Sequence, residues 1–301
     1  MGNQKIIYLV LIASFFFFSC SKDLYFDASI PPETETVNNF VVRWPSYVSE
    51  EKRQVIRDVL NSMILVEGDI FMMGNSIEYD PDSRLNESPA HYVQLSDYYI
   101  CAKELSYEQV QTLLSNGSTR SSSINNYNGK YLYYSWDDWK SILDLLYEYT
   151  NVLFTFPTEA QWEFAARGGK LSLGFKYPGS NDLDKIWTSE LDEINHSLPN
   201  EIGLYNMADL KGEWCADTYA EYESGTMLTN PLVTKGEGHV VRGGCYASSG
   251  EYKQWVSSRS TTYYFDYSRT FEDSRMCRST ARACETGKNW DIGCRVAINI
   301  N

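Results

Sequence analysis

The sequence has few of the residues that metal centres and nucleic-acid interfaces require. Its 301 residues include three histidines, His91, His196 and His239, and no two of them are four residues apart. The seven cysteines include no Cys-x-x-Cys pair, so a zinc site built from Cys and His is not expected. Lys and Arg total 26 against 40 acidic residues, and no basic cluster offsets the net charge of −14. This balance argues against nucleic acid as a partner.

A membrane-spanning run is also missing near the N-terminus. The apolar stretch 6–18 follows Lys5 and ends before Cys20. It is shorter than the roughly 20 residues that a spanning helix needs, and it is typical of a signal peptide, here residues 1–19. The step from Ser19 to Cys20 resembles the relaxed lipobox of Bacteroidetes-type lipoproteins, which implies a lipid on Cys20. The alternative is an ordinary signal peptide in which Cys20 has no role.

The N-terminal features predict a place in the cell envelope. Lipid on Cys20 would attach the chain to the outer membrane, and the short segment 21–23 leaves both the periplasmic and the cell-surface side open. An even number of further cysteines is compatible with disulfides in an exported protein, and six cysteines allow 15 pairings. Those six are Cys101, Cys215, Cys245, Cys277, Cys284 and Cys294.

The rest of the chain divides into a tether, a leading helix and one large domain. Residues 20–48 contain Pro31 and Pro32 and are predicted to be a flexible tether. An apolar stripe at the helical period predicts a helix over 49–62, and the domain follows over 63–301. Within the domain, periodicity and capping residues predict two strands across a turn in 63–74, a strand over 91–95, and helices over 106–115, 136–149 and 158–167. Short strands and long loops are expected beyond residue 200.

Several spaced motifs follow the order of one protein family. They are residues 63–74 (MILVEGDIFMMG), 87–91 (ESPAH), 135–138 (SWDD), 156–169 (FPTEAQWEFAARGG), 203–207 (GLYNM), 213–215 (EWC), 242–244 (RGG) and 293–295 (GCR). Together they resemble the formylglycine-generating enzyme, or sulfatase-modifying factor, family. The resemblance implies a C-type-lectin-like α+β fold with short sheets, few helices and much irregular chain. Trp162 and Trp214 are expected in the core, whereas Glu159 and Glu163 are expected on an exposed helix face.

The resemblance implies a copper site that this sequence does not reproduce. Enzymes of the family bind copper through two cysteines and oxidise a substrate cysteine with oxygen. The matching positions here are Ser248 and Lys253. Soft thiolates suit Cu(I), whereas a hydroxyl and an ammonium do not. Copper is therefore not expected, and the sequence predicts no catalytic residue.

Calcium is the other cofactor that the resemblance implies. The family's calcium-binding loop has an Asn where this chain has Leu210, which offers no side-chain oxygen. Glu213 and Asp217 remain as candidate calcium ligands.

The segment after the Arg-Gly-Gly motif is rich in Tyr, Ser, Thr and Arg, a mixture that recurs in adaptable recognition surfaces. Its alternative interpretation is an ordinary polar surface loop. The candidate ligand-binding residues are Tyr246, Tyr252, Trp255, Arg259, Tyr263, Tyr264 and Tyr267.

Two functions follow from these features. The first is an exported lipoprotein with a non-catalytic domain that binds a protein or a glycan or acts in envelope assembly. The second is a copper- or metal-dependent oxidoreductase that acts on protein thiols.

Overall fold

The computed structural model describes most of the chain between residues 32 and 300. The described residues are 32–75, 78, 80–115, 132–182, 185, 198–208, 211–244, 253–257, 260–264, 277–289 and 292–300, and for 253–257 and 260–264 they are described by backbone alone. Cys20, with the predicted signal peptide and the first part of the predicted tether, lies outside these ranges.

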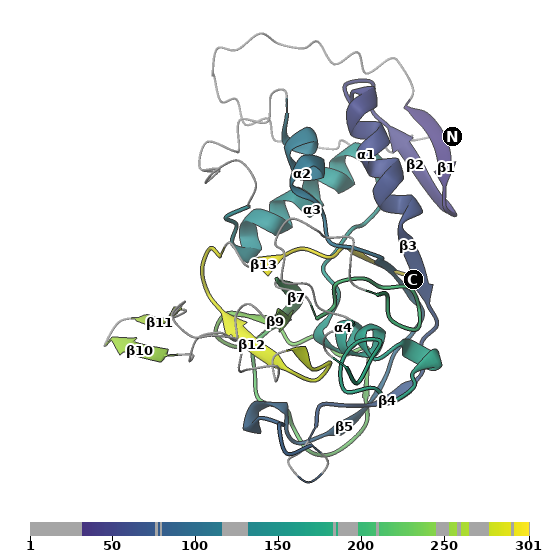
Figure 1. Cartoon of the computed structure of the whole chain (residues 1–301). Coiled ribbons are helices and arrows are strands. Elements are labelled where there is room, and N and C mark those ends of the chain that lie inside the picture. The colour runs from purple at the N-terminus through teal and green to yellow at the C-terminus, as the bar shows by residue number, and fades with distance from the viewer. Residues whose placement is uncertain are drawn as a thin grey trace, which may run out of the picture.

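The first described element is a β-hairpin. Strand β1 (Glu33–Val37) pairs antiparallel with β2 (Phe40–Trp44). Asn38 and Asn39 join the two strands with positive φ angles, which Asn tolerates better than most residues. In Figure 1 the hairpin lies against helix α1 (Glu50–Asn61), which begins and ends within a residue of the predicted limits.

The hairpin belongs to the folded domain, so the tether predicted over 20–48 is wrong for residues 33–44. Val42 and Trp44 are fully buried. The guanidinium groups of Arg53 and Arg57 in α1 each lie 5.5 Å from the centroid of the Trp44 ring. Both contacts join β2 to α1, and the polar Glu-Thr repeat of β1 does not predict them.

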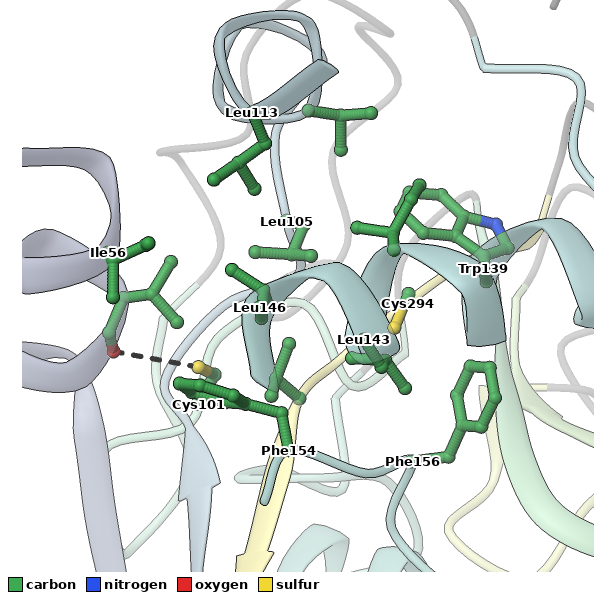
Figure 2. Close-up of a cluster of buried hydrophobic side chains, with 14 of the residues drawn as sticks. Ile56, Cys101, Leu105, Leu113, Trp139, Leu143, Leu146, Phe154, Phe156 and Cys294 are labelled. Atoms are coloured by element: carbon green, nitrogen blue, oxygen red, sulfur yellow. Dashed lines mark hydrogen bonds between the residues drawn. The ribbon is translucent and has the colours of Figure 1, made fainter. Parts of the chain in front are cut away.

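Two helices cover the main core beside α1. They are α2 (Tyr107–Leu114) and α3 (Trp136–Thr150), and in each an N-cap serine accepts a hydrogen bond from the backbone three residues on. Helix α3 ends at Asn151, which takes the left-handed conformation common at this position. Figure 2 shows how Leu113 of α2 and Leu143 and Leu146 of α3 surround this core. The figure also labels further members of the cluster: Ile56, Cys101, Leu105, Trp139, Phe154, Phe156 and Cys294.

The described strands of the domain form several small sheets. One has the order β14 (Ala297–Asn299), β6 (Tyr98–Cys101), β3 (Met63–Val66), and another has the order β4 (Ile70–Met73), β5 (His91–Gln94), β8 (Leu228–Thr229). The two strands predicted within 63–74 are therefore present as β3 and β4. They belong to different sheets and do not pair with each other.

A four-stranded sheet lies at the centre of the molecule. Its order is β12 (Arg282–Glu285), β9 (His239–Gly243), β7 (Gly212–Thr218), β13 (Ile292–Gly293). Helix α4 (Glu159–Ala166) packs beside this sheet, and short 3₁₀ turns lie at Leu85–Glu87 and Gly169–Leu171. The expected α+β class is confirmed. Among the helices of the described ranges, none has both the length and the hydropathy to cross a membrane.

A further hairpin, β10 (Lys253–Ser257) with β11 (Ser260–Tyr264), extends away from the rest of the fold at the left of Figure 1. It follows β9 in the chain and precedes β12, so it lies within the stretch where the sequence predicts a recognition surface.

Candidate functional site

The stretch 245–276 leaves the central sheet at a point where the backbone is closely packed. Gly243 and Gly244 have φ angles of +66° and +88°. A Cβ on Gly243 would lie 2.8 Å from the carbonyl oxygen of Met207, and one on Gly244 would lie 2.6 Å from the nitrogen of Gly212. Both positions therefore require glycine, which fixes the direction in which the chain departs from β9.

The chain returns to the fold at a second fixed point. Cys277 is disulfide-bonded to a cysteine outside the described residues, and its side chain is buried. The next residue, Arg278, is 1% exposed and donates to both carboxylate oxygens of Glu87. The hydroxyl of Thr280 donates to the same carboxylate at 2.7 Å. These contacts hold 277–280 against the 3₁₀ turn that contains Glu87.

Arg242 joins the two fixed points. Its guanidinium donates to the carbonyl oxygens of Thr280 and Ala281, each at 2.7 Å, and also to Glu163. The guanidinium carbon lies 5.3 Å from the centroid of the Trp162 ring. We call Glu87, Glu163, Arg242, Arg278 and Thr280 the anchor cluster, because it ties both ends of the 245–276 stretch to the core.

The carboxylates of α4 belong to this buried polar region. Every residue of α4 is buried, so the expectation that Glu159 and Glu163 lie on an exposed face is wrong. Arg282 donates to both oxygens of Glu159 at 2.7 and 2.8 Å. Burial alone would raise the pKa of Glu163, but the positive charges of Arg167 and Arg242 outweigh burial and hold that pKa below its ordinary value. Both carboxylates act as structural ion-pair partners.

Three of the candidate ligand-binding residues lie on the strands of the projecting hairpin. Trp255 is on β10, and Tyr263 and Tyr264 are on β11. Lys253, at one of the positions where the family has a copper-binding cysteine, begins β10 and pairs in register with Tyr264. The other copper position and the remaining candidates lie outside the described residues: Ser248, Tyr246, Tyr252, Arg259 and Tyr267.

The carboxylate oxygens of the two candidate calcium ligands already accept hydrogen bonds from other groups of the protein. Glu213 receives hydrogen bonds from Arg295 on both oxygens and from the indole nitrogen of Trp162 at 2.7 Å. Asp217 receives the backbone N–H of Glu159 at 2.7 Å and of Val233 at 2.9 Å. A guanidinium in contact with Glu213 repels a cation, so these residues do not fit calcium.

Asp217 gives a pH-dependent prediction. Burial, the largest cause, raises its pKa from 3.8 to about 6, and the neighbouring Glu159 charge adds to this. Because the folded state holds this proton more tightly than the unfolded state, the stability that Asp217 contributes is greatest below about pH 4 and is lost as the pH rises through about 6. We expect the unfolding free energy of the wild type, minus that of Asp217→Asn, to fall by roughly 1–3 kcal/mol between pH 4 and 7.

Urea unfolding of both proteins across that range measures this difference. The Asn amide meets a backbone N–H that the carboxylate accepted, which lowers stability by a similar amount at every pH and leaves the slope interpretable. A difference that stays constant with pH would contradict the raised pKa.

The cysteines within the described ranges do not fit a copper site. Cys101, Cys215 and Cys294 are buried free thiols, and burial raises the pKa of each, for Cys101 to about 11. Burial likewise raises the pKa of the half-buried Cys284 to about 11. Metal ligation and nucleophilic attack need the thiolate, which these surroundings disfavour. In the part of the chain that the structure describes, no three His, Cys, Asp or Glu side chains gather in a metal-binding arrangement.

Sequence reasoning missed the buried arginines. Arg242 and Arg295 appear in the sequence analysis only as members of motifs, and Arg278 and Arg282 do not appear there. The structure shows that each of the four has a buried carboxylate partner. A usable signal was present, because all four partners are glutamates of the motifs, Glu159 among them. Glu87, Glu163 and Glu213 all belong to spaced motifs of the resemblance.

Comparison with known proteins identifies the family. The model of the sulfatase-modifying factor enzyme 1-like domain matches residues 48–300, and the chain belongs to this family. Among solved structures, variable protein 1 of Treponema denticola superposes with a TM-score of 0.58 at 19% identity, over 89% of this chain and 99% of that one. PvdO from Pseudomonas aeruginosa also gives 0.58 at 19% identity, over 79% of this chain and 94% of its own. These two likenesses confirm the expected fold.

The proteins that are similar in sequence carry several different names. The serine/threonine-protein kinase Pkn1 of Chlamydia trachomatis is 27% identical over 228 residues, which are 67% of this chain and 36% of that protein. The formylglycine-generating enzyme of Streptomyces coelicolor is 31% identical over 128 residues, 35% of this chain and 40% of the enzyme. The chaperone protein LppX of Paenibacillus barcinonensis is 25% identical over 60% of this chain and 80% of its own length. The chain thus spans well under half of the kinase relative.

Proposed function

We propose that this chain is an exported, lipid-anchored protein of the cell envelope, whose sulfatase-modifying-factor-like domain binds a ligand without catalysis. The ligand is a protein or a glycan, and the binding residues lie in the 245–276 stretch. The lipid is attached to Cys20, and the domain faces the periplasm or the cell exterior.

The double attachment of the 245–276 stretch carries this proposal. Gly243 and Gly244 fix its departure, the Cys277 disulfide and the Arg278–Glu87 pair fix its return, and Arg242 bridges the two. Binding residues are commonly placed on loops that a rigid scaffold holds. A long chain segment tied at both ends to a buried ionic cluster matches that arrangement, and its Tyr-rich composition suits recognition.

The chemistry of the cysteines supports a non-catalytic role. Ser248 and Lys253 occupy the positions where the family's enzymes have copper-binding cysteines, and neither side chain binds Cu(I) well. The described free thiols are held in their protonated form by burial. The similarity to the chaperone protein LppX is compatible with a domain that binds a protein partner.

An oxidation assay separates this proposal from the enzyme alternative. The purified protein is loaded with Cu(I) and incubated in air with a cysteine-containing peptide, and the peptide is analysed by mass spectrometry for conversion of the thiol to an aldehyde. We expect no aldehyde above the protein-free control. Copper-dependent aldehyde formation would refute the non-catalytic proposal in favour of the oxidoreductase.

A binding assay tests the proposed surface directly. The protein is applied to glycan and peptide arrays beside a variant with Tyr263, Tyr264 and Tyr267 replaced by Ala. We expect the variant to lose array binding by tenfold or more with a thermal midpoint within about 2 °C, because the replaced residues lie outside the anchor cluster. The matched control is Tyr147→Ala, a tyrosine 45% exposed on α3, which should bind as the wild type does. Equal binding by the triple variant would place the surface elsewhere.

A further inference from the structure

The cysteine count narrows the disulfide partner of Cys277 to two residues. The sequence has seven cysteines, and Cys277 is disulfide-bonded. Within the described ranges the other cysteines are free thiols: Cys101, Cys215, Cys284 and Cys294. The two that remain, Cys20 and Cys245, lie outside the described residues. The partner of Cys277 is therefore one of these two.

The pairing of strands β9 and β12 favours Cys245 as the partner. The two strands are antiparallel with Arg242 opposite Arg282, so the chain that leaves β9 starts beside the chain that enters β12. Cys245 follows Arg242 by three residues, and Cys277 precedes Thr280 by three. The guanidinium of Arg242 donates to the carbonyl oxygen of Thr280 at 2.7 Å. Three residues of chain span at most about 10 Å, and a disulfide needs Cα atoms about 4–7 Å apart, so the two cysteines are within reach of each other.

Cys20 is the poorer partner on chemical and spatial grounds. It is the residue proposed to carry the lipid, and a sulfur that is bonded to lipid as a thioether has no thiol to oxidise. It also precedes β1, whereas Cys277 precedes β12. Figure 1 shows β1 at the upper right of the molecule and β12 to the left of its centre.

We propose that Cys277 is cross-linked to Cys245, and that ligand binding by the 245–276 stretch requires this bond. The inference rests on the proposed recognition function and adds a redox requirement to it. In forming the bond the two thiols lose two protons and two electrons. A protein disulfide of the export compartment accepts them by thiol–disulfide exchange and becomes a dithiol.

The anchor cluster explains why the bond can control binding without controlling the fold. The buried pair of Arg278 with Glu87 and the contacts of Arg242 hold the chain near Cys277 whether or not the disulfide is present. Reduction therefore leaves the core intact and removes only the covalent link between the two ends of the stretch. A stretch with less restricted ends must lose more conformational freedom when it binds, which lowers affinity.

A peptide map under non-reducing conditions tests the pairing. Free thiols of the purified protein are alkylated, and the protein is then digested with trypsin. Cys245 lies in the peptide 243–253, Cys277 lies in the peptide 276–278, and Cys20 lies in the peptide that ends at Lys22. We expect the mass of 243–253 joined to 276–278, and we expect it to disappear on reduction. Either an alkylated Cys277 or a bond from Cys277 to the Cys20 peptide overturns the proposal.

Thermal unfolding with and without dithiothreitol tests the pairing a second way. Cys245→Ala should lower the thermal midpoint by about 5–10 °C, because the unfolded chain loses a cross-link that restricts it. Dithiothreitol should lower the wild-type midpoint by a similar amount and leave Cys245→Ala unchanged. The matched controls, Cys20→Ala and the free-thiol variant Cys284→Ala, should respond to dithiothreitol as the wild type does. A Cys245→Ala protein that still responds to the reductant contradicts the pairing.

Array binding in the same two conditions tests the redox requirement. We expect dithiothreitol to lower wild-type binding at least fivefold at a temperature where the reduced protein is folded, and Cys245→Ala to show the lower level in both conditions. Equal binding by the oxidised and reduced wild type would leave recognition standing and overturn the requirement. If the wild type binds nothing on the arrays, the proposed function fails and the redox requirement fails with it, whereas the peptide map decides the pairing by itself.

Discussion

Replacing Glu213 by leucine is expected to lower the free energy of unfolding by about 3–5 kcal/mol, the range measured when one partner of a buried ion pair is removed. Glu213 and Arg295 are both fully buried, and Arg295 donates to the two carboxylate oxygens at 2.8 and 2.6 Å. The variant leaves a guanidinium charge in the core that has lost its bidentate carboxylate partner and keeps its hydrogen bonds to the carbonyl oxygens of Cys101 and Tyr205. It also leaves the indole N–H of Trp162 without its acceptor.

Urea unfolding followed by tryptophan fluorescence measures this loss. The double variant Glu213→Leu with Arg295→Met removes both charges and should recover part of the stability, since the cost comes mainly from the unpaired charge. The matched control is Lys140→Ala, which breaks an exposed ion pair with Asp144 on α3. Exposed helical pairs contribute about 0.3–0.5 kcal/mol, so this control should be nearly neutral. If Glu213→Leu and Lys140→Ala lower the free energy of unfolding by similar amounts, the buried ion pair contributes no more stability than the exposed one.

Replacing Trp44 by alanine should cost about 3–5 kcal/mol, as for other buried tryptophans. The side chain is fully buried, its indole nitrogen donates to Glu35 at 2.8 Å, and two guanidinium groups lie over its ring. Removing the ring leaves a cavity between the N-terminal hairpin and α1 and takes away the cation–π contacts of Arg53 and Arg57. If residues 33–44 were a tether, the same substitution would leave stability unchanged.

Thermal and urea unfolding of Trp44→Ala distinguish these outcomes. Val41→Ala is the control, because Val41 lies on the same strand but is 58% exposed. It should change stability by less than about 0.5 kcal/mol. A neutral Trp44→Ala would mean that the hairpin does not contribute to the cooperative unit.

Helices were the elements that the sequence predicted best. The limits of α1, α2, α3 and α4 were found to within one residue, because caps and apolar periodicity are local signals that neighbouring residues supply. The N-cap Thr158 and its partner Gln161 form the capping box that was expected. Strand partners were not predictable in this way, since β3 pairs with β6 and β4 pairs with β5 rather than with each other.

The polar residues of the site were predicted less well, for a different reason. Glu159 and Glu163 lie four residues apart in α4, and a sequence with charged residues at that spacing normally indicates a solvated face. Their partners Arg282 and Arg242 are 123 and 79 residues away in sequence. A charge is stable in a core only with a partner, and the identity of that partner is decided by how the sheet and helix pack.

The sequence by itself determined the family, the α+β class, the helix limits and the absence of cysteine from the positions at 248 and 253 where copper would need sulfur. These follow from local sequence patterns and from the order of the motifs along the chain, and both can be recognised without a three-dimensional structure. Only the tertiary structure decided that residues 33–44 fold into the domain, that the motif glutamates are buried partners of arginine, and that both ends of the 245–276 stretch meet at Arg242. Each of these depends on contacts between residues distant in the chain, which form only when the packed core excludes water and makes a paired charge preferable to an isolated one.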